Sequence, residues 1–325
     1  GTLGKQLVVR LLGLGASKVV IFSRDEQKQA EFQKFLEEEM SQFIPVVRFQ
    51  LGDVIDSQRL AQAFTNIDVV IHAAALKIVS ACEYNPVQCA QTNIIGTTNV
   101  VMEAIKAGVE KVIVVSTDKA VDPVNVYGAS KCMAEKMSSA IARSFNPMGQ
   151  RGFSCSIVRY GNVFGSRGSL FEALPKYAPN SVFALTDNRA TRFFINADTA
   201  VNNVLRAVVV GGNGDVLVFK MPSWNVGSVV QALRPDLKIK EIGLRPGEKL
   251  HESLISNHSP TEIVLEFNDY FVIVPDGTDL ARYKEMSGFI RQMTEENFSI
   301  RSDDEKFLST EPGRIYEVMS AVSAE

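Results

Sequence analysis

The sequence contains little cysteine, and its cysteines are far apart. Only four occur in 325 residues, Cys82, Cys89, Cys132 and Cys155, and no two of them have Cys-x-x-Cys spacing. This pattern indicates neither a disulfide framework nor a cysteine zinc site. We therefore expect buried thiols of a cytoplasmic protein.

The sequence also lacks a charge excess and a long apolar run. Its 34 Lys and Arg residues oppose 37 Asp and Glu residues, for a formal net charge of −3, so we expect no nucleic-acid partner. No apolar run reaches the roughly 18 residues that a membrane span needs, and no secretory leader precedes the first element. We expect a soluble protein without a membrane span, long enough for roughly two domains or for one large α/β domain with an appendage.

The first half of the sequence alternates short β-branched runs with amphipathic stretches. The runs expected to form strands are Lys18–Phe22, Val46–Leu51, Val69–His72, Lys111–Val115 and Ser154–Val158. The stretches expected to form helices are Asp25–Met40, Gln58–Phe64, Pro86–Ala107 and Val126–Ser144. This alternation predicts an α/β fold with a Rossmann-like, doubly wound parallel sheet.

The two halves of the chain differ in pattern. We expect a nucleotide-binding domain in residues 1–165 and a mainly substrate-binding region in residues 166–325, where prolines separate short elements and some elements can return to the sheet. Such a nucleotide-binding domain opens with a strand and a glycine-rich turn. We interpret Gly1 and Gly4 as the end of that turn, with the first strand missing from the sequence; a flexible end before a helix is the alternative.

A tyrosine and a lysine lie four residues apart just after a predicted strand. On a helix, Tyr127 and Lys131 project from one face. Tyrosine has an ordinary pKa of about 10, and a neighbouring ammonium lowers the pKa of its phenol and favours proton transfer. Thr117 lies ten residues before Tyr127, at the carboxyl end of a predicted strand. Open α/β sheets build their sites at this end of their strands.

Several motifs across nearly the whole chain resemble one family. They are Ser23-Arg24-Asp25-Glu26, Leu51-Gly52-Asp53-Val54, His72-Ala73-Ala74-Ala75-Leu76-Lys77, Ser116-Thr117-Asp118-Lys119, Tyr127 with Lys131, Arg159-Tyr160-Gly161-Asn162-Val163, Thr191-Arg192-Phe193 and Arg245-Pro246-Gly247-Glu248-Lys249. Together they resemble the extended short-chain dehydrogenases/reductases, specifically the inverting UDP-N-acetylglucosamine 4,6-dehydratases and related polysaccharide biosynthesis proteins.

The resemblance implies catalytic roles for five residues. Tyr127, tuned by Lys131, takes the proton of the sugar C4 hydroxyl while hydride leaves C4 for the nicotinamide, and Thr117 hydrogen-bonds the C4 oxygen. Lys119 then abstracts the C5 proton and Asp118 protonates the departing C6 hydroxyl, after which hydride returns to C6. Elimination of water needs this acid and base; an exposed ion pair is the alternative interpretation of Asp118 and Lys119.

The cofactor implied is NADP, with NAD less favoured. Ser23 and Arg24 follow the second strand of the fold, where an arginine suits a 2′-phosphate and an acidic residue suits a ribose hydroxyl. Asp25 is either a ribose acceptor or a helix cap. The other residues expected at the cofactor are Gly1, Gly4, Asp53, Val54, Ala73, Ala74, Tyr127 and Lys131, the last at the nicotinamide ribose.

The substrate implied is a UDP-sugar. Arginine forks match a diphosphate, so Arg192 and Arg245 are expected there, and Asn162, Glu248 and Lys77 are expected at the sugar or phosphate.

We expect His72 to be a core residue. Because His251 and His258 have no partners at metal spacing, we predict no metal. The family also implies a homo-oligomer.

Two alternatives remain at this point. A UDP-sugar 4-epimerase of the same superfamily would use Tyr127 without needing Asp118 and Lys119 as an acid and base. A non-catalytic scaffold that senses dinucleotides would keep the fold and would not need Tyr127, Lys131 and the arginines. A 4-keto-6-deoxy product distinguishes a dehydratase from both.

Overall fold

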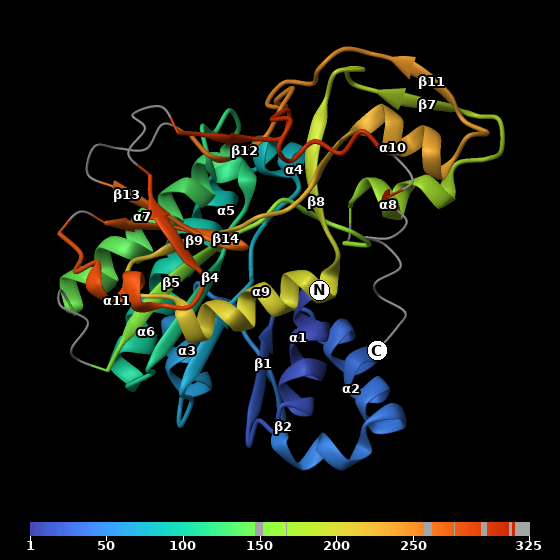
Figure 1. The fold of residues 1–325 in the computed structure, drawn as a ribbon. Helices are drawn as coiled ribbons and strands as arrows, with labels where there is room; N and C mark the ends of the chain where they lie inside the picture. Colours follow the sequence, from blue (N-terminus) through green and yellow to red (C-terminus); the bar gives the residue numbers. More distant parts are fainter. Residues whose placement is uncertain are drawn as a thin grey trace.

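The computed structural model describes residues 1–146, 152–166, 168–256, 262–275, 277–293, 298–311 and 314–315. A central sheet of seven strands runs through the molecule in the order β15, β13, β14, β9, β5, β4, β3 (Figure 1). These strands are β3 (Val69–His72), β4 (Lys111–Val115), β5 (Ser154–Arg159), β9 (Val216–Phe219), β13 (Glu262–Phe267), β14 (Tyr270–Pro275) and β15 (Phe289–Gln292). The four from β3 to β9 are parallel, and β13, β14 and β15 continue the sheet in antiparallel pairing.

Two further strands form a parallel pair of their own. β1 (Val19–Ser23) pairs with β2 (Val47–Leu51), starting with Val19 opposite Val47. Within the residues that the structure describes, no ladder joins this pair to β3. With α1 (Thr2–Gly13) and α2 (Glu26–Glu39), the pair forms the lower lobe in Figure 1.

Helices cover both faces of the parallel sheet. Successive side chains of strand β4 point to opposite faces of the sheet. On one face, Val112 and Val114 pack with residues of α3 (Ser57–Ala63), α6 (Gly96–Ala107) and α7 (Val126–Phe145). Between them, Ile113 packs on the other face with α1 and α9 (Ala197–Val210). The predicted Rossmann-like α/β fold is confirmed.

The five predicted strands agree with β1 to β5 to within one residue at each end. The predicted helix Pro86–Ala107 is less regular than expected. It consists of α5 (Pro86–Ala90), a π-helical segment η2 (Gln91–Ile95) and α6.

Shorter elements complete the chain. Three small sheets contain β6 (Asn162–Val163), β8 (Thr191–Ile195) and β10 (Ser223–Asn225); β7 (Val182–Leu185) and β11 (Lys238–Glu241); and β12 (Ser253–Ile255) and β16 (Ile300–Arg301). The remaining helices are α4 (Val79–Tyr84), α8 (Leu170–Ala173), α10 (Val226–Leu233), α11 (Ala281–Glu285) and the 3-10 turns η1 (Ser41–Val46), η3 (Asp118–Ala120) and η4 (Leu174–Lys176).

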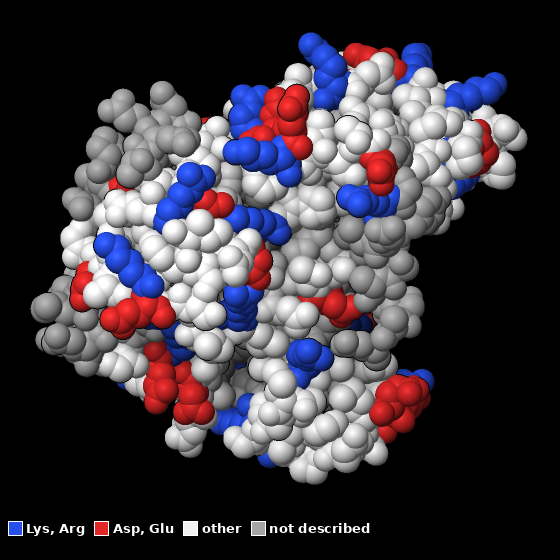
Figure 2. Space-filling view, viewed as in Figure 1, with Lys and Arg blue, Asp and Glu red and all other residues white. Residues whose placement is uncertain are grey.

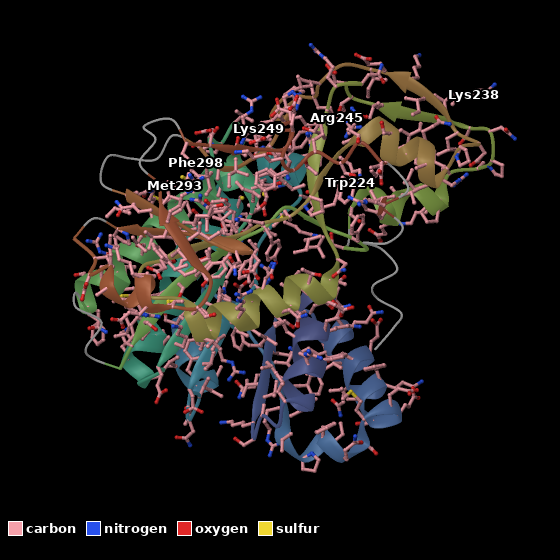
Figure 3. The ribbon with its side chains drawn as sticks, in the orientation of Figure 1. Trp224, Lys238, Arg245, Lys249, Met293 and Phe298 are labelled. Atoms are coloured by element: carbon pink, nitrogen blue, oxygen red, sulfur yellow. The ribbon has the colours of Figure 1, made fainter. Side chains whose placement is uncertain are left out.

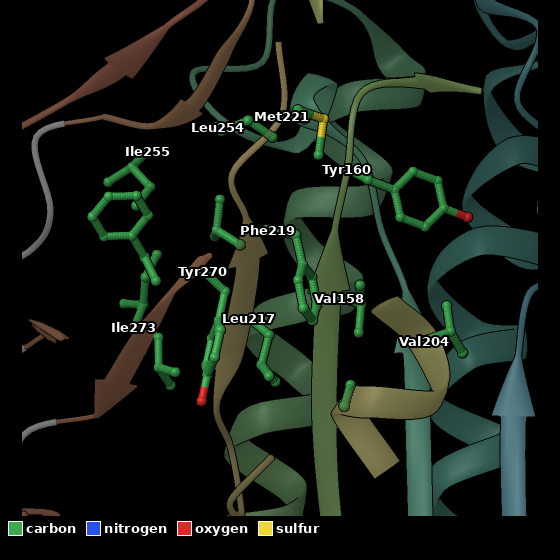
Figure 4. Close-up of a cluster of buried hydrophobic side chains, with 14 of the residues drawn as sticks. Val158, Tyr160, Val204, Leu217, Phe219, Met221, Leu254, Ile255, Tyr270 and Ile273 are labelled. Atoms are coloured by element: carbon green, nitrogen blue, oxygen red, sulfur yellow. The ribbon is translucent and has the colours of Figure 1, made fainter. Parts of the chain in front are cut away.

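The largest core cluster joins the two halves of the chain. Val158 and Tyr160 pack with Leu217, Leu254 and Tyr270, which come from three later segments (Figure 4). This packing fixes β12 and the segment before it relative to β5, and so fixes residues of the second half beside the carboxyl end of the parallel strands.

The surface carries both signs of charge. Figure 2 shows Lys and Arg interspersed with Asp and Glu over the visible face. In the described parts of the chain, no helix combines the length and the apolar character that crossing a bilayer demands.

Candidate active site

The turn after β4 holds the predicted acid and base. Thr117 caps η3, and its hydroxyl donates to Asp118 Oδ1 at 2.9 Å. Lys119 Nζ lies 3.0 Å from the same oxygen. The Asp118 side chain is completely buried, and its Oδ2 has no hydrogen-bond partner. The pair is therefore an enclosed ion pair and not an exposed one.

Helix α7 brings Tyr127 against this turn. Asn125 starts the helix, because its side chain accepts from Gly128 N at 2.7 Å. A Cβ at Gly128 would lie 2.3 Å from Lys119 O, so only glycine allows the first turn of α7 to approach η3 this closely. Tyr127 is buried, and its phenol hydrogen-bonds Thr117.

The phenol and the lysine of the Tyr-x-x-x-Lys motif are both desolvated. Burial raises the pKa of Tyr127 to about 12, although the Lys119 charge and the Thr117 hydrogen bond act to lower it. Burial lowers the pKa of Lys131 to about 8, and Glu135 opposes this shift. Lys131 Nζ donates to Val115 O at 2.8 Å. In this structure, Lys119 is thus a cation that favours the phenolate, a role that sequence reasoning gave to Lys131.

The two members of the acid-base pair respond differently to their surroundings. Burial raises the pKa of Asp118 above its ordinary value, although Lys119 opposes the shift, so this carboxyl takes up a proton more readily than usual. Burial acts to lower the pKa of Lys119, but Asp118 and Glu252 outweigh it and raise this pKa. Lys119 is therefore an ammonium in the unliganded site.

Residues from the second half of the chain complete the cluster. Asn162, which begins β6, accepts from Lys119 Nζ through Oδ1 at 3.3 Å. Glu252 Oε1 also lies 3.3 Å from Lys119 Nζ, and Lys249 Nζ lies 3.7 Å from Glu252 Oε2. Sequence reasoning selected Asn162 but missed Glu252 and any role for Lys249 at this cluster. Only the inclusion of Lys249 in a family motif pointed to this segment.

Arg192 hydrogen-bonds the backbone of the segment that contains Lys249 and Leu250. Its guanidinium donates to Thr191 O at 2.7 Å, Leu250 O at 2.9 Å and Lys249 O at 2.9 Å. Its Nε lies 3.9 Å from Glu252 Oε1. Most donors of Arg192 are therefore engaged within the protein, and binding of a diphosphate by this residue stays a prediction.

The motif from Arg245 to Lys249 lies beside the start of α7. Asn125 Nδ2 donates to Gly247 O at 2.7 Å, and Lys249 Nζ donates to Val121 O. Arg245 has a side chain that is 64% exposed and lies 3.7 Å from Glu248. Figure 3 shows Arg245 and Lys249 on the segment that runs from β11, at the top of the view, to β12. An exposed guanidinium here is available to a ligand.

Several residues predicted for the cofactor lie at or just after the ends of β1 and β2. Arg24 Nη1 contacts Asp53 Oδ2 at 3.1 Å, so two predicted cofactor residues lie side by side after β1 and β2. The Asp25 side chain accepts from Lys28 N at the start of α2, which agrees with its interpretation as a helix cap. Ser23 Oγ accepts from Gln29 Nε2 at 2.9 Å.

The remaining positions differ in exposure. Ala73 and Ala74 are exposed after β3, whereas Val54 is buried. No described atom lies within 4 Å of the place where a Cβ would stand at Gly1 or Gly4, at the start of α1. A helix start presents unpaired amides that favour a phosphate, so this arrangement fits a dinucleotide. Lys77 is exposed on the segment that follows.

The two histidines that the structure describes, His72 and His251, each contact a threonine. His72 is buried, its Nε2 lies 2.9 Å from Thr97 Oγ1, and burial, together with the Lys131 charge, lowers the pKa of His72 to about 3. His251 lies 2.8 Å from Thr191 Oγ1 and 3.6 Å from Asp303. His258 lies outside the described residues. Among the residues that are described, no three metal-binding side chains come together.

Comparison with known proteins identifies the family. A family model described as polysaccharide biosynthesis protein matches residues 1–275. The chain belongs to this family. It is 37% identical over 318 residues to a UDP-N-acetylglucosamine 4,6-dehydratase (inverting) of Campylobacter jejuni, covering 96% of this chain and 92% of the relative. It is also 38% identical over 268 residues to a UDP-glucose 4-epimerase of Rickettsia canadensis, covering 81% and 76%.

Solved structures support the fold of this family member. The X-ray structure of Pen from Bacillus thuringiensis is 30% identical, with a TM-score of 0.85 over 99% of this chain and 95% of that one. DesIV, a dTDP-glucose 4,6-dehydratase from Streptomyces venezuelae with NAD and TYD bound, is 19% identical, with a TM-score of 0.64 over 77% and 84%. The second likeness bears on the fold alone.

Proposed function

We propose that this protein is a nucleotide-sugar 4,6-dehydratase, a hydro-lyase that converts UDP-N-acetylglucosamine to a UDP-4-keto-6-deoxy-N-acetylhexosamine with inversion at C5. The observation that carries the proposal is the buried Asp118–Lys119 pair beside Tyr127 and Thr117. An enclosed acid and base next to a phenol suit removal of water from a sugar better than they suit a simple epimerisation. The name of the Campylobacter jejuni relative supports the same substrate.

The cofactor that we propose is NADP in preference to NAD. Arg24 would hold the 2′-phosphate, the start of α1 at Gly1 and Gly4 would face the pyrophosphate, and Ala73 and Ala74 would allow close approach. Asp53 and Val54 would border the adenine, with Ser23 beside Arg24 and Lys131 at the nicotinamide ribose. When bound, this group would accept a hydride from sugar C4 and supply one to C6.

Tyr127 and Thr117 would act on the C4 oxygen. The phenol, as phenolate, takes the hydroxyl proton, and the Thr117 hydroxyl is close enough to bond the same oxygen. Burial keeps the pKa of Tyr127 raised in the unliganded site, and the Lys119 charge and the Thr117 hydrogen bond oppose this shift in the direction that proton transfer requires.

Lys119 and Asp118 would carry out the elimination. In the unliganded site Lys119 is charged, so it becomes a base only after it releases a proton, and Asp118 Oδ1 is an acceptor at 3.0 Å. This transfer forms a neutral amine and a protonated carboxyl. The amine then takes the C5 proton, and the carboxyl gives its proton to the departing C6 hydroxyl. When hydride returns to C6, C5 must regain a proton, and the Lys119 ammonium would deliver it.

The exposed side of the cluster would bind the UDP-sugar. Arg245 and Glu248 are exposed or partly exposed on the loop beside α7, and Arg245 suits the diphosphate. Asn162 reaches Lys119 and would orient the sugar together with it. Lys77 and Arg192 are further candidates for the sugar or phosphate, with Arg192 limited by the carbonyls that it already binds.

A cytoplasmic homo-oligomer that supplies sugars for surface polysaccharide or protein glycosylation is the setting that we propose. Exposed apolar side chains on α5, α6 and α7, namely Val87, Met102 and Met133, support a subunit contact along these helices.

The test is incubation with UDP-N-acetylglucosamine and NADP, followed by mass spectrometry and product NMR in deuterated water. Loss of one water with deuterium at an inverted C5 is expected. An unchanged mass with a new C4 epimer would favour the epimerase, which the identity to the Rickettsia canadensis relative makes the second candidate. No change at all would favour a dinucleotide-sensing scaffold.

A further inference from the structure

Glu252 is a buried carboxylate at the centre of the cluster. Its side chain is 4% exposed, and three cations surround it. Oε1 lies 3.3 Å from Lys119 Nζ and 3.9 Å from Arg192 Nε, and Oε2 lies 3.7 Å from Lys249 Nζ. A buried charge is costly unless it is paired, so this carboxylate and its partners stabilise one another.

The backbone of Glu252 is fixed as firmly as its side chain. Glu252 N donates to Ser302 Oγ at 2.9 Å, and Glu252 O accepts from Ser302 N at 2.8 Å. Ser302 Oγ also lies 2.7 Å from Thr191 Oγ1 on β8. The carboxylate therefore has little freedom to leave Lys119.

We propose that Glu252 is a positioning residue for Lys119, whose ammonium it holds between Asp118 and Asn162. This inference rests on the proposed function, because it assumes that Lys119 is the base. Without Glu252, the Lys119 chain would lose one of the two carboxylates that direct Nζ toward the turn after β4, and proton abstraction would lose its geometry.

The groups that face Lys119 give this role a measurable signature. Asp118 lies on its own turn, Tyr127 on α7, Asn162 on β6, Arg192 on β8, and Glu252 and Lys249 on the segment before β12. Asp118 and Glu252 raise the pKa of Lys119, and Arg192 lowers it. Loss of the Glu252 charge must therefore lower this pKa.

The experiment compares wild type with Glu252→Gln, Glu252→Asp and the matched control Glu266→Gln. Glu266 is also a carboxylate between two cations, Lys220 and Arg291, but it lies on β13 away from the cluster. The pH dependence of kcat is measured with UDP-N-acetylglucosamine. A second readout, independent of turnover, is the pH dependence of Lys119 acylation by a trace of acetic anhydride, followed by peptide mass spectrometry.

In Glu252→Gln, we expect the alkaline limb of kcat, where the Lys119–Asp118 pair loses its shared proton, and the midpoint of Lys119 acylation to move to lower pH by about one unit or more. The plateau of kcat should fall about tenfold or more, since positioning is lost, with a smaller change in KM. Glu252→Asp should keep both midpoints near those of wild type, and Glu266→Gln should match wild type throughout.

Unshifted midpoints in Glu252→Gln would overturn the inference, as would the same shift in Glu266→Gln. Should Glu252→Gln fail to fold, a midpoint in Glu252→Asp that is displaced as far as one unit would overturn it. Absence of turnover by wild type would refute the proposed function. The acylation midpoints would still decide whether Glu252 acts on Lys119.

Discussion

Asp118→Asn should separate two steps that wild type carries out together. The substitution keeps the shape of a completely buried side chain and removes both its charge and its ability to donate an acidic proton. General acid catalysis contributes about 10² to 10⁴ in rate, which is about 3–5 kcal/mol of barrier, so water loss should slow by that factor. The variant should remain folded, because Glu252 still pairs with Lys119 and Oδ2 of Asp118 has no hydrogen-bond partner to lose.

Removal of the C5 proton should persist in this variant. Asp118 is the proton acceptor of Lys119 in the proposed wild-type step, but it is also one of the two carboxylates that raise the pKa of Lys119. Without it, Lys119, whose side chain is 20% exposed, loses its proton more readily to solvent and so still forms the neutral amine. The assay is incubation with UDP-N-acetylglucosamine in deuterated water, with NMR of the recovered substrate. Deuterium at C5 without loss of water is the expected result.

Two comparisons make the assay decisive. Lys119→Met should abolish both exchange and water loss, because no amine remains. Asp215→Asn removes another completely buried carboxylate with a raised pKa, bonded to Tyr283 and Gly212 away from the cluster, and should leave the ratio of exchange to elimination unchanged. If Asp118→Asn loses water at a near-normal rate, or if Lys119→Met still exchanges C5, the assigned roles are wrong.

Three further predictions follow from other contacts. Arg24→Ala should weaken binding of NADP about tenfold and leave NAD nearly unchanged in calorimetry, since one charge-assisted bond to phosphate is lost; equal losses for both would contradict the assignment. Gly128→Ala should lower both kcat and the melting temperature, because its Cβ would lie 2.3 Å from Lys119 O, whereas Gly13→Ala, which meets nothing within 4 Å, should lower neither. His72 has a folded-state pKa of about 3, below an ordinary value of about 6.5. The unfolded chain therefore takes up a proton on His72 first as the pH falls, so the free energy of unfolding keeps its full value above pH 6.5 and is lower by about 3 kcal/mol at pH 4.5. Urea unfolding of His72→Asn should therefore depend less on pH over this range, and an unchanged dependence would count against a neutral buried imidazole.

The sequence predicted the parallel strands well because their burial on both faces requires nearly continuous apolar runs. It did not predict the π-helical segment inside Pro86–Ala107, because helical periodicity alone does not reveal one extra residue in a turn. The segment takes part in a tertiary contact. Asn93 lies in it, accepts from Leu76 N at 2.8 Å and donates to Leu76 O at 2.9 Å, and so holds the chain after β3.

Some residues of the candidate site could be predicted from the sequence and others could not. Residues within one local motif, such as Thr117, Asp118 and Lys119, were predictable because a strand end fixes them together. Glu252 was not, because it follows Lys119 by 133 positions, and tertiary contacts bring it back, among them the pairing of β12 with β16 and the core packing of Leu254. No periodicity or spacing in the sequence connects the two, and the cluster became visible only with the packing of β12 against η3.

The opposing demands on Lys119 explain why the proposed pair needs enclosure. A base must be strong enough to take a proton from carbon, and the carboxylates of Asp118 and Glu252 supply that strength by raising the pKa of Lys119. The same carboxylates keep the amine protonated, so a proton acceptor must be close, and burial makes Asp118 such an acceptor. In the proposed elimination, the proton moves from Nζ to Oδ1, Lys119 regains one from C5, and Asp118 gives one to the departing hydroxyl. Both groups then return to the ion pair, so this step needs no exchange with solvent, and opening the cluster to water should slow it even where every catalytic residue is kept.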